Sequence, residues 1–215
     1  MACLFSPVEF PEEWLPFENE EKLKVVPLRL GTSEYNSIAE LFLSSMGIRS
    51  VTIFNIQRIQ NVYLWTDFIG RRNAILERQG GYCREEYVFH GTSSVDPKKI
   101  YGGQKSFDVV QSAQGRYGRG IYFAKDATLS HQGYVHRRGS MFYLLVAKVV
   151  LGETYVCLNP SQLRGHGPPE MPQQEGGITR SYNSIEGRLN GCPIYIVPRN
   201  DMTYPAYLIV YKSNN

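Results

Sequence analysis

The sequence has few of the features that mark metal-binding or disulfide-rich proteins. Its four cysteines, Cys3, Cys83, Cys157 and Cys192, are far apart and form no CxxC pair. That spacing argues against both a zinc ribbon and a dense disulfide framework. We therefore expect free thiols and no bound metal.

Long apolar runs and basic clusters are also missing. The chain has no stretch of about 20 apolar residues, which a membrane span would need, and residues 1–14 already contain three glutamates, unlike a signal peptide. The net charge is only +3, with no basic run longer than two residues, so a nucleic-acid acceptor is unsupported and no membrane partner is expected. These absences predict a cytoplasmic or nuclear location.

The composition is that of one folded, strand-rich domain. A length of 215 residues suits a single domain, and we expect a monomer spanning residues 1–215. The 15 tyrosines and 10 phenylalanines favour β-structure. Residues 1–20 form an N-terminal extension, and residues 163–177, rich in Pro, Gly and Gln, predict a long surface loop.

Apolar periodicity predicts helices early and strands late. Residues 22–30 alternate between apolar and polar and predict a strand, and Ser33 is the expected N-cap of a helix that stops at Gly47. Residues 50–60 predict a second strand, after which Asn61 is expected to cap a second helix. Five short strands follow, at residues 85–90, 119–124, 141–150, 193–198 and 205–212. This order predicts an α+β fold with largely antiparallel sheets.

Three segments carry the candidate chemistry: Phe-His-Gly-Thr at 89–92, Tyr-Gly-Arg-Gly-Ile-Tyr-Phe-Ala at 117–124, and residues 130–134. Taken alone, His90 is more often a structural histidine. The Gly-x-Gly at 118–120 precedes a strand and opens no helix, which excludes a Rossmann dinucleotide site.

Together, in this order and spacing, the segments resemble the catalytic core of the poly(ADP-ribose) polymerase superfamily of diphtheria-toxin-like ADP-ribosyltransferases. The resemblance covers nearly the whole chain, because residues 58–65 look like the early strand-to-helix junction and residues 204–209 like the final strand. It implies an ADP-ribosyltransferase fold, with two largely antiparallel sheets forming a split NAD cleft between flanking helices. It also implies NAD as a substrate and a protein side chain as acceptor.

The resemblance assigns the nicotinamide end of NAD to four residues. Tyr122 and Tyr134 match the aromatic pair that holds the ring, each stack contributing on the order of 1 kcal/mol. The backbone of Gly91 and the hydroxyl of Ser130 match the groups that bind the carboxamide. A carboxamide needs one acceptor and two donors answered, which such a pair can supply.

The remaining matched residues position the rest of the substrate. His90 matches the triad histidine, whose imidazole holds a ribose hydroxyl of NAD, and Thr92 is expected to touch the adenosine ribose. Phe123 follows Tyr122 in the same motif and is included in the NAD site. Positioning is the main catalytic contribution expected from these groups.

The sequence departs from the polymer-forming pattern at the third triad position. Those members carry a glutamate there, whereas the matching residue here is Ile194, so the triad reads His90, Tyr122, Ile194. Glu186 is eight residues upstream and too far along one strand to replace it. His-Tyr-Ile resembles the mono-ADP-ribosylating branch, which lacks the helical regulatory domain, and predicts transfer of one ADP-ribose unit with release of nicotinamide.

A second departure keeps an alternative open. The segment at residues 108–116 corresponds to the loop that lids the NAD site and is shorter by a residue or two. A weak or inactive NAD- or ADP-ribose-binding module on the same fold is therefore the alternative to an enzyme. Retention of the polar site residues favours the enzyme.

Overall fold

The computed structural model describes residues 8–47, 50–110, 112, 114–163, 167–172 and 177–214. Its helices are α1 (Ser33–Ser45), α2 (Val62–Arg78), α3 (Lys98–Tyr101) and α4 (Ala127–His131), with 3-10 turns η1 (Pro160–Leu163) and η2 (Asn200–Met202). Its strands are β1 (Leu23–Pro27), β2 (Val51–Asn61), β3 (Glu85–His90), β4 (Ile121–Ala124), β5 (His136–Arg138), β6 (Met141–Val150), β7 (Thr154–Val156), β8 (Ser184–Leu189), β9 (Cys192–Val197) and β10 (Thr203–Ser213).

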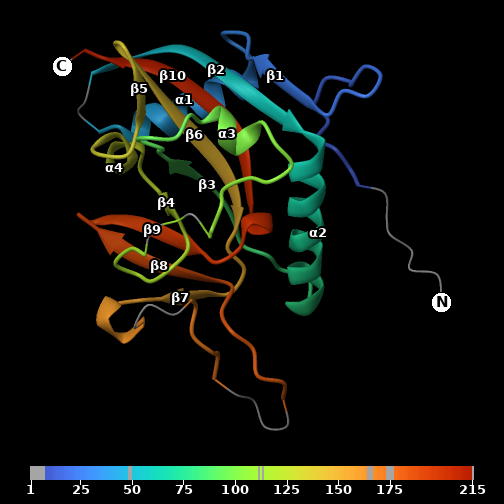
Figure 1. Cartoon of the computed structure of the whole chain (residues 1–215), viewed down its shortest axis with the longest axis vertical. Helices are drawn as coiled ribbons and strands as arrows, with labels where there is room; N and C mark the ends of the chain where they lie inside the picture. Colours follow the sequence, from blue (N-terminus) through green and yellow to red (C-terminus); the bar gives the residue numbers. More distant parts are fainter. Residues whose placement is uncertain are drawn as a thin grey trace.

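The described strands form one mostly antiparallel hydrogen-bonded path with two parts (Figure 1). The larger part has the order β1-β2-β10-β6-β3, with β5 added to β6, and the smaller has the order β4-β9-β8-β7. One register pair, Phe89 with Ala124, joins them. The predicted α+β class is confirmed, and the two expected sheets are continuous through that single pair.

The helix ends follow from capping chemistry. Asn61 caps α2 as predicted, since its Oδ1 accepts from the backbone N–H groups of Tyr63 and Leu64 at 3.1 and 3.2 Å. The predicted cap of α1 is wrong by one residue: the Thr32 hydroxyl accepts from the Tyr35 N–H, and Ser33 is the first helical residue. Adjacent hydroxyl residues offer the same chemistry, so sequence alone did not separate them.

All five late strands that the sequence predicts are present, with ends shifted by at most two residues. The short elements α3, α4, β5, β7 and β8 were not predicted, because three to six residues are too few to show a period. Strand β7 pairs with β8 in parallel. The missed elements include α4, which carries Ser130.

Two packed regions hold the domain together. In the larger, Phe42 of α1 contacts Phe89 of β3 and Tyr211 of β10, with ring centroids 6.4 and 4.8 Å apart. The smaller region surrounds Ile194 and includes Tyr117. The candidate site motifs therefore lie where the two parts of the sheet meet.

The segment expected as an N-terminal extension packs against this domain from residue 8 onward, and residues 1–7 lie outside the described part. The indole Nε1–H of Trp65 donates to the carbonyl oxygen of Glu9 at 2.8 Å, and Gln60 exchanges two hydrogen bonds with the backbone of Leu15. The aromatic ring of Trp14 lies 5.5 Å from that of Trp65. Residues 8–17 are thus part of the folded unit.

The predicted loop at 163–177 is only partly within the described residues, since 164–166 and 173–176 lie outside them. Leu163 is buried at the end of η1. Residues 169–171 pair with 180–182 through the Met171 N–H to Arg180 and the Tyr182 N–H to Pro169. The described part of this segment is therefore a loop outside the sheet whose two arms are hydrogen-bonded to each other.

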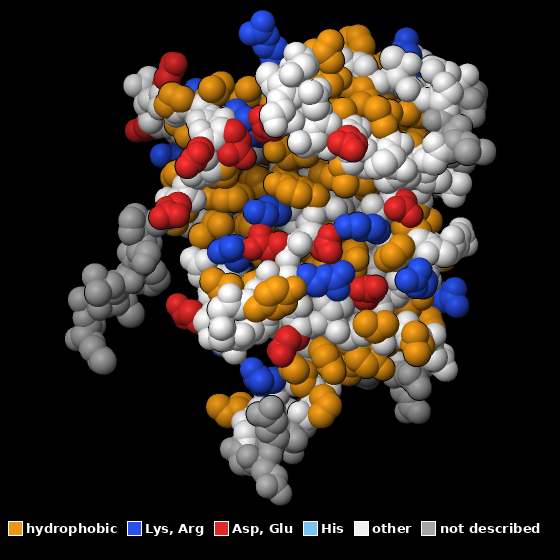
Figure 2. Space-filling model, turned by 180° about the vertical axis from the view of Figure 1, so that it is seen from behind, with side chains coloured by type: hydrophobic (Ala, Val, Ile, Leu, Met, Phe, Trp, Pro, Cys, Tyr) orange, Lys and Arg blue, Asp and Glu red, His pale blue; other side chains and the backbone are white. Residues whose placement is uncertain are grey.

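Seen from behind, acidic and basic side chains alternate across the middle of the molecule, and hydrophobic side chains gather above them (Figure 2). Among the described residues, no helix is long and apolar enough to cross a membrane. In the same ranges, no group of three or more His, Cys, Asp or Glu could hold a metal ion.

Candidate active site

The imidazole of His90, at the end of β3, is fixed by its neighbours. Its Nδ1 lies 2.8 Å from the carbonyl oxygen of Tyr122 on β4. Its ring contacts those of Phe107 and Phe123, with centroids 4.8 and 5.4 Å away. Burial lowers the pKa of His90 to about 4, although the bond to Tyr122 acts in the opposite direction. The ring is therefore neutral at pH 7.

The carbonyl partner also determines the tautomer. A carbonyl oxygen only accepts hydrogen bonds, so Nδ1 of His90 must be the donor. In a neutral ring the proton on Nδ1 leaves Nε2 as an acceptor. His90 can thus accept a hydrogen bond from a hydroxyl group such as that of a ribose.

Tyr122 fixes the loop in front of its ring. Its hydroxyl donates to the carbonyl oxygen of Gly118 at 2.7 Å and accepts from the Tyr117 N–H at 2.9 Å. Burial raises the pKa of this hydroxyl, which keeps it protonated and able to donate. A methyl group on Gly115 would lie 2.5 Å from the Tyr122 ring, so the backbone there passes directly against the tyrosine.

Tyr117 anchors the same loop from the other side. Its hydroxyl donates to the carbonyl of Arg188 and accepts from the N–H of that residue on β8, at 2.8 and 2.9 Å. Its ring covers Gly187, where a methyl group would lie 2.4 Å away. The sequence included Tyr117 in the motif but gave it no role, because the facing glycine is 70 residues away.

Gly91 and Tyr134 are brought together by close backbone contact. A methyl group on Gly91 would lie 2.6 Å from the backbone oxygen of Tyr134, a distance that real side chains do not tolerate. The Tyr134 side chain is 56% exposed, so its ring is accessible to a ligand. Glycine at position 91 is needed for this approach and leaves its backbone groups beside the tyrosine.

Ser130, on the short helix α4, has a buried side chain whose hydroxyl makes no hydrogen bond within the described part of the chain. Its backbone carbonyl accepts from the Tyr134 N–H at 3.2 Å, which links it to the aromatic residue. A hydroxyl without a protein partner is available to a polar ligand group. Ser130 is therefore suitably placed to bind a carboxamide beside Tyr134.

Two matched residues lie deeper than the sequence suggested. Thr92 donates its hydroxyl to the carbonyl of Val95 and caps a turn, which leaves only its acceptor lone pairs for a ligand. The Phe123 side chain is 1% exposed and packs against His90 and Phe107. A direct contact of the Phe123 ring with NAD is inconsistent with this burial, and the ring instead supports His90.

Ile194 pairs with Ala124 of β4 and Gly187 of β8. It is 5% exposed, in the cluster that also contacts Tyr122. Tyr122 pairs directly with Ile196, two residues after Ile194 on β9. Side chains two residues apart on a strand lie on the same face, so Ile194 and Tyr122 lie on one face of the sheet. An apolar side chain therefore occupies the position next to Tyr122.

Glu186 cannot substitute for a carboxylate at Ile194. It pairs with Tyr195, the neighbour of Ile194, so strand alternation places the two side chains on opposite faces. Its carboxylate accepts from Arg84 at 3.1 Å, and Arg84 also donates to the Tyr195 hydroxyl. Glu186 has a structural ion pair and faces away from Tyr122.

A comparison with protein families adds independent information to this geometry. Residues 32–213 match the family model described as the poly(ADP-ribose) polymerase catalytic domain. The chain belongs to this family. The described residues thus have the fold of a poly(ADP-ribose) polymerase catalytic domain, and NAD is the substrate of that family.

The curated relatives carry different product descriptions. A probable poly [ADP-ribose] polymerase of Dictyostelium discoideum is 29% identical over 94% of this chain and 57% of its own length. The protein mono-ADP-ribosyltransferase PARP12 of Homo sapiens is 29% identical over 98% of this chain and 29% of its own. PARP11 of Homo sapiens, also named a protein mono-ADP-ribosyltransferase, is 27% identical over 96% of this chain and 64% of its own length. The chain therefore spans between about a third and two thirds of these relatives.

Proposed function

We propose that this poly(ADP-ribose) polymerase-family domain transfers one ADP-ribose unit from NAD to a protein side chain and releases nicotinamide. The observation that carries the proposal is the combination of a neutral His90 acceptor with Ile194, and no carboxylate, next to Tyr122. The first group can hold a ribose hydroxyl. The second cannot activate one for chain growth.

The proposed reaction breaks the bond between the nicotinamide nitrogen and C1 of the ribose. The bonding electrons return to nicotinamide, which leaves as a neutral ring, and an acceptor oxygen then forms a new bond to C1. A Glu or Asp side chain is already ionised at pH 7, given a reference pKa of about 4, so no general base is required for it. Catalysis would come from the pose of the dinucleotide and from fixed polar contacts.

Each matched residue has a specific role in this proposal. His90 Nε2 accepts from a ribose hydroxyl, Ser130 and the Gly91 backbone bind the carboxamide, and Tyr134 stacks on the nicotinamide. Tyr122 holds the turn at residues 115–118 beside the site. The acceptor would approach the ribose from the side of Ile194.

The alternative is a module that binds NAD or ADP-ribose without reacting. It is favoured by the close contact of Gly115 with the Tyr122 ring, which restricts the space in front of that ring. The unpartnered hydroxyl of Ser130 is available to the nicotinamide carboxamide, so it favours a site for intact NAD, the substrate of the enzyme, over a site for ADP-ribose alone.

A nicotinamide-release assay separates the two. The enzyme should release nicotinamide from NAD and incorporate ADP-ribose into protein, and a folded His90→Ala variant should lose most of both. Tyr82→Ala, which truncates a tyrosine that is 69% exposed and outside the site, is the matched control and should behave as wild type. NAD binding without nicotinamide release in the wild type would establish the alternative.

We also propose a cytoplasmic or nuclear location for the domain. Cys83, Cys157 and Cys192 are free thiols, and the latter two are buried. Free thiols of this kind are common in proteins of reducing compartments. Localisation of a tagged protein in cells tests this proposal.

A further inference from the structure

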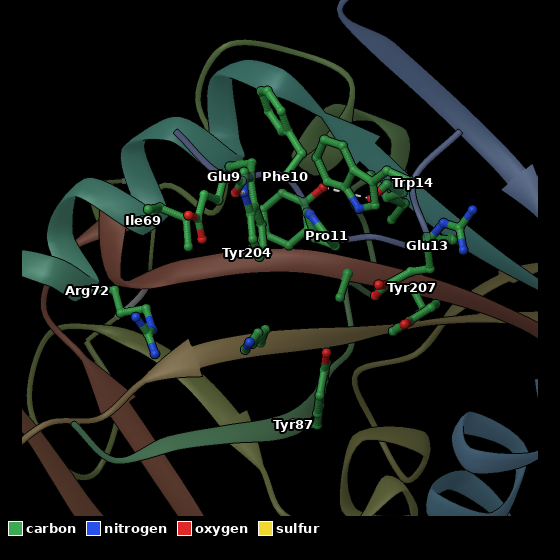
Figure 3. A pocket seen from close by; sticks show the side chains of 15 residues that line it. Glu9, Phe10, Pro11, Glu13, Trp14, Ile69, Arg72, Tyr87, Tyr204 and Tyr207 are labelled. Atoms are coloured by element: carbon green, nitrogen blue, oxygen red, sulfur yellow. Dashed lines mark hydrogen bonds between the residues drawn. The ribbon is translucent and has the colours of Figure 1, made fainter. Parts of the chain in front are cut away.

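A cavity that the family function does not use lies on the sheet under the N-terminal segment. It has a volume of about 320 Å³, within the range of small ligand sites. Its wall combines residues 9–11, 13 and 14 with side chains from β2, α2, β3, β6 and β10 (Figure 3). Aromatic rings dominate it: Phe10, Trp14, Trp65, Tyr87, Tyr204 and Tyr207.

This cavity is on the face of the sheet opposite His90. Tyr87 and Lys148 line it and are direct partners across β3 and β6. His90 follows Tyr87 by three residues, an odd number, so strand alternation turns its side chain to the other face. The cavity is therefore separate from the NAD site.

Each cation of the cavity is already in an ion pair. Arg58 pairs with Glu34 at 2.6 Å, while Arg72 and Lys148 both pair with Glu85, the latter at 3.1 Å. The ammonium of Lys148 also lies 5.9 and 6.0 Å from the ring centres of Trp65 and Tyr87. The three cations and their two carboxylates together leave one net positive charge, and each cation already has a carboxylate partner.

Free negative charge, in contrast, lies at the mouth of the cavity. Glu9 and Glu13 line it, are exposed, and have no ion pair among the described residues. The cavity has three cations, their two carboxylate partners Glu34 and Glu85, and the two free carboxylates. Its net charge is therefore one negative charge. The two free carboxylates lie at opposite ends, Glu13 beside Tyr207 and Glu9 toward Arg72 (Figure 3).

The tyrosines at the Glu13 end lie in a negative potential. Burial raises the pKa of Tyr87, and the carboxylates of Glu13, Glu85 and Glu34 raise it further. Burial also raises the pKa of Tyr207, with contributions from Tyr87, Glu34 and Glu13. The Tyr87 hydroxyl has no hydrogen-bond partner within the described ranges and points toward the cavity (Figure 3). This end thus offers aromatic faces, an acceptor hydroxyl and an unpaired carboxylate.

We infer that this cavity is a docking site for an arginine side chain presented by a segment of a partner protein. A guanidinium is planar, stacks on aromatic rings, and donates to a carboxylate through two parallel bonds. Glu13 would accept these bonds while Tyr87 and Trp14 contact the cation and its alkyl stem. The partner is a protein with an exposed basic segment.

Intrinsic fluorescence reports on this site directly, because Trp14 and Trp65 are the two tryptophans of the chain and both line the cavity. The full chain is titrated, without NAD, with a glycine–serine pentapeptide that has blocked termini and one central arginine as its single charge. The arginine peptide should change the fluorescence saturably. The same peptide with citrulline, which keeps the shape and loses the charge, should bind roughly tenfold more weakly.

Matched variants assign the effect to Glu13. Glu13→Gln should weaken the arginine peptide about fivefold, whereas Glu12→Gln, at the exposed neighbouring residue that does not line the cavity, should bind as wild type. Equal thermal unfolding temperatures of the two variants would confirm that both are folded. No saturable change with the arginine peptide, equal binding of the citrulline peptide, equal or tighter binding of an acidic peptide, or full affinity in Glu13→Gln would overturn the inference.

Discussion

Nδ1 of His90 donates a hydrogen bond to the carbonyl oxygen of Tyr122 at 2.8 Å, across the junction between the two parts of the sheet. Two consequences follow from one bond. The imidazole is held in a single tautomer with Nε2 available, and the residue that supplies the carbonyl also fixes the neighbouring turn through its hydroxyl. Substrate positioning and the local fold therefore depend on the same pair.

The burial of the His90 ring predicts a pH dependence of stability. The pKa of His90 is lowered to about 4 in the folded protein from an ordinary value of 6.5, so the unfolded chain binds more protons between these values. The free energy of unfolding should therefore fall as the pH falls from about 6.5 toward 4. Urea denaturation at several pH values, compared between the wild type and His90→Asn, measures this contribution. The fall should be smaller in His90→Asn, and parallel curves would contradict it.

The accessible ring of Tyr134 predicts a loss of substrate affinity on truncation. Tyr134→Ala should weaken NAD and nicotinamide-like inhibitors by about 1–3 kcal/mol, because a stacked face and excluded water are both lost. Calorimetric titration of the inhibitor measures the change. Tyr82→Ala removes a tyrosine of similar exposure elsewhere and should leave the affinity unaltered. Wild-type affinity in a folded Tyr134→Ala protein would refute the assigned stack.

Alanine variants of two glycines in the site test whether close backbone contact is the reason for glycine at position 91. Gly91→Ala should place a methyl group against the backbone of Tyr134 and displace that segment. We expect the free energy of unfolding to fall by about 1–3 kcal/mol. Binding of the inhibitor should be weakened as well. Gly133→Ala is the matched control, since a methyl group there meets nothing within 4 Å and the backbone is not left-handed. Thermal unfolding and inhibitor titration are measured on both. If the two variants behaved alike, close approach at Gly91 would not be the reason for the glycine.

The elements with strong local signals were predictable from the sequence, and those fixed by distant contacts were not. Asn61 and the strand at 85–90 were correct because capping chemistry and β-branched or aromatic residues act locally. The burial of Phe123 was missed, since its packing depends on Phe107 and His90 from other segments. The role of Thr92 could not be decided from its residue type, because a threonine hydroxyl caps turns and binds ligands with the same group; in the structure it donates to the carbonyl of Val95.

The last prediction concerns Ile194 and the length of the product. Elongation requires a ribose hydroxyl, weakly acidic, to be activated by a carboxylate beside Tyr122, and Ile194 provides none while Glu186 faces the opposite side of the sheet. Incubation with labelled NAD should give a target band shifted by one small increment per site and resistant to a polymer-degrading glycohydrolase. A ladder of long chains would overturn the assignment.

Two variants test the reason for this outcome. Glu186→Gln should leave the product unchanged, because it removes only a partly buried ion pair with Arg84. Ile194→Glu should still make no polymer, since the turn beside Tyr122 and the acceptor surface would also have to fit a chain end. Its carboxyl would be placed among apolar side chains, where it should cost a few kcal/mol of stability, on the order of 2–4, or remain protonated. Denaturation at pH 5 and pH 8 distinguishes these two results, because a carboxyl that stays protonated when folded makes the variant less stable than the wild type mainly at the higher pH.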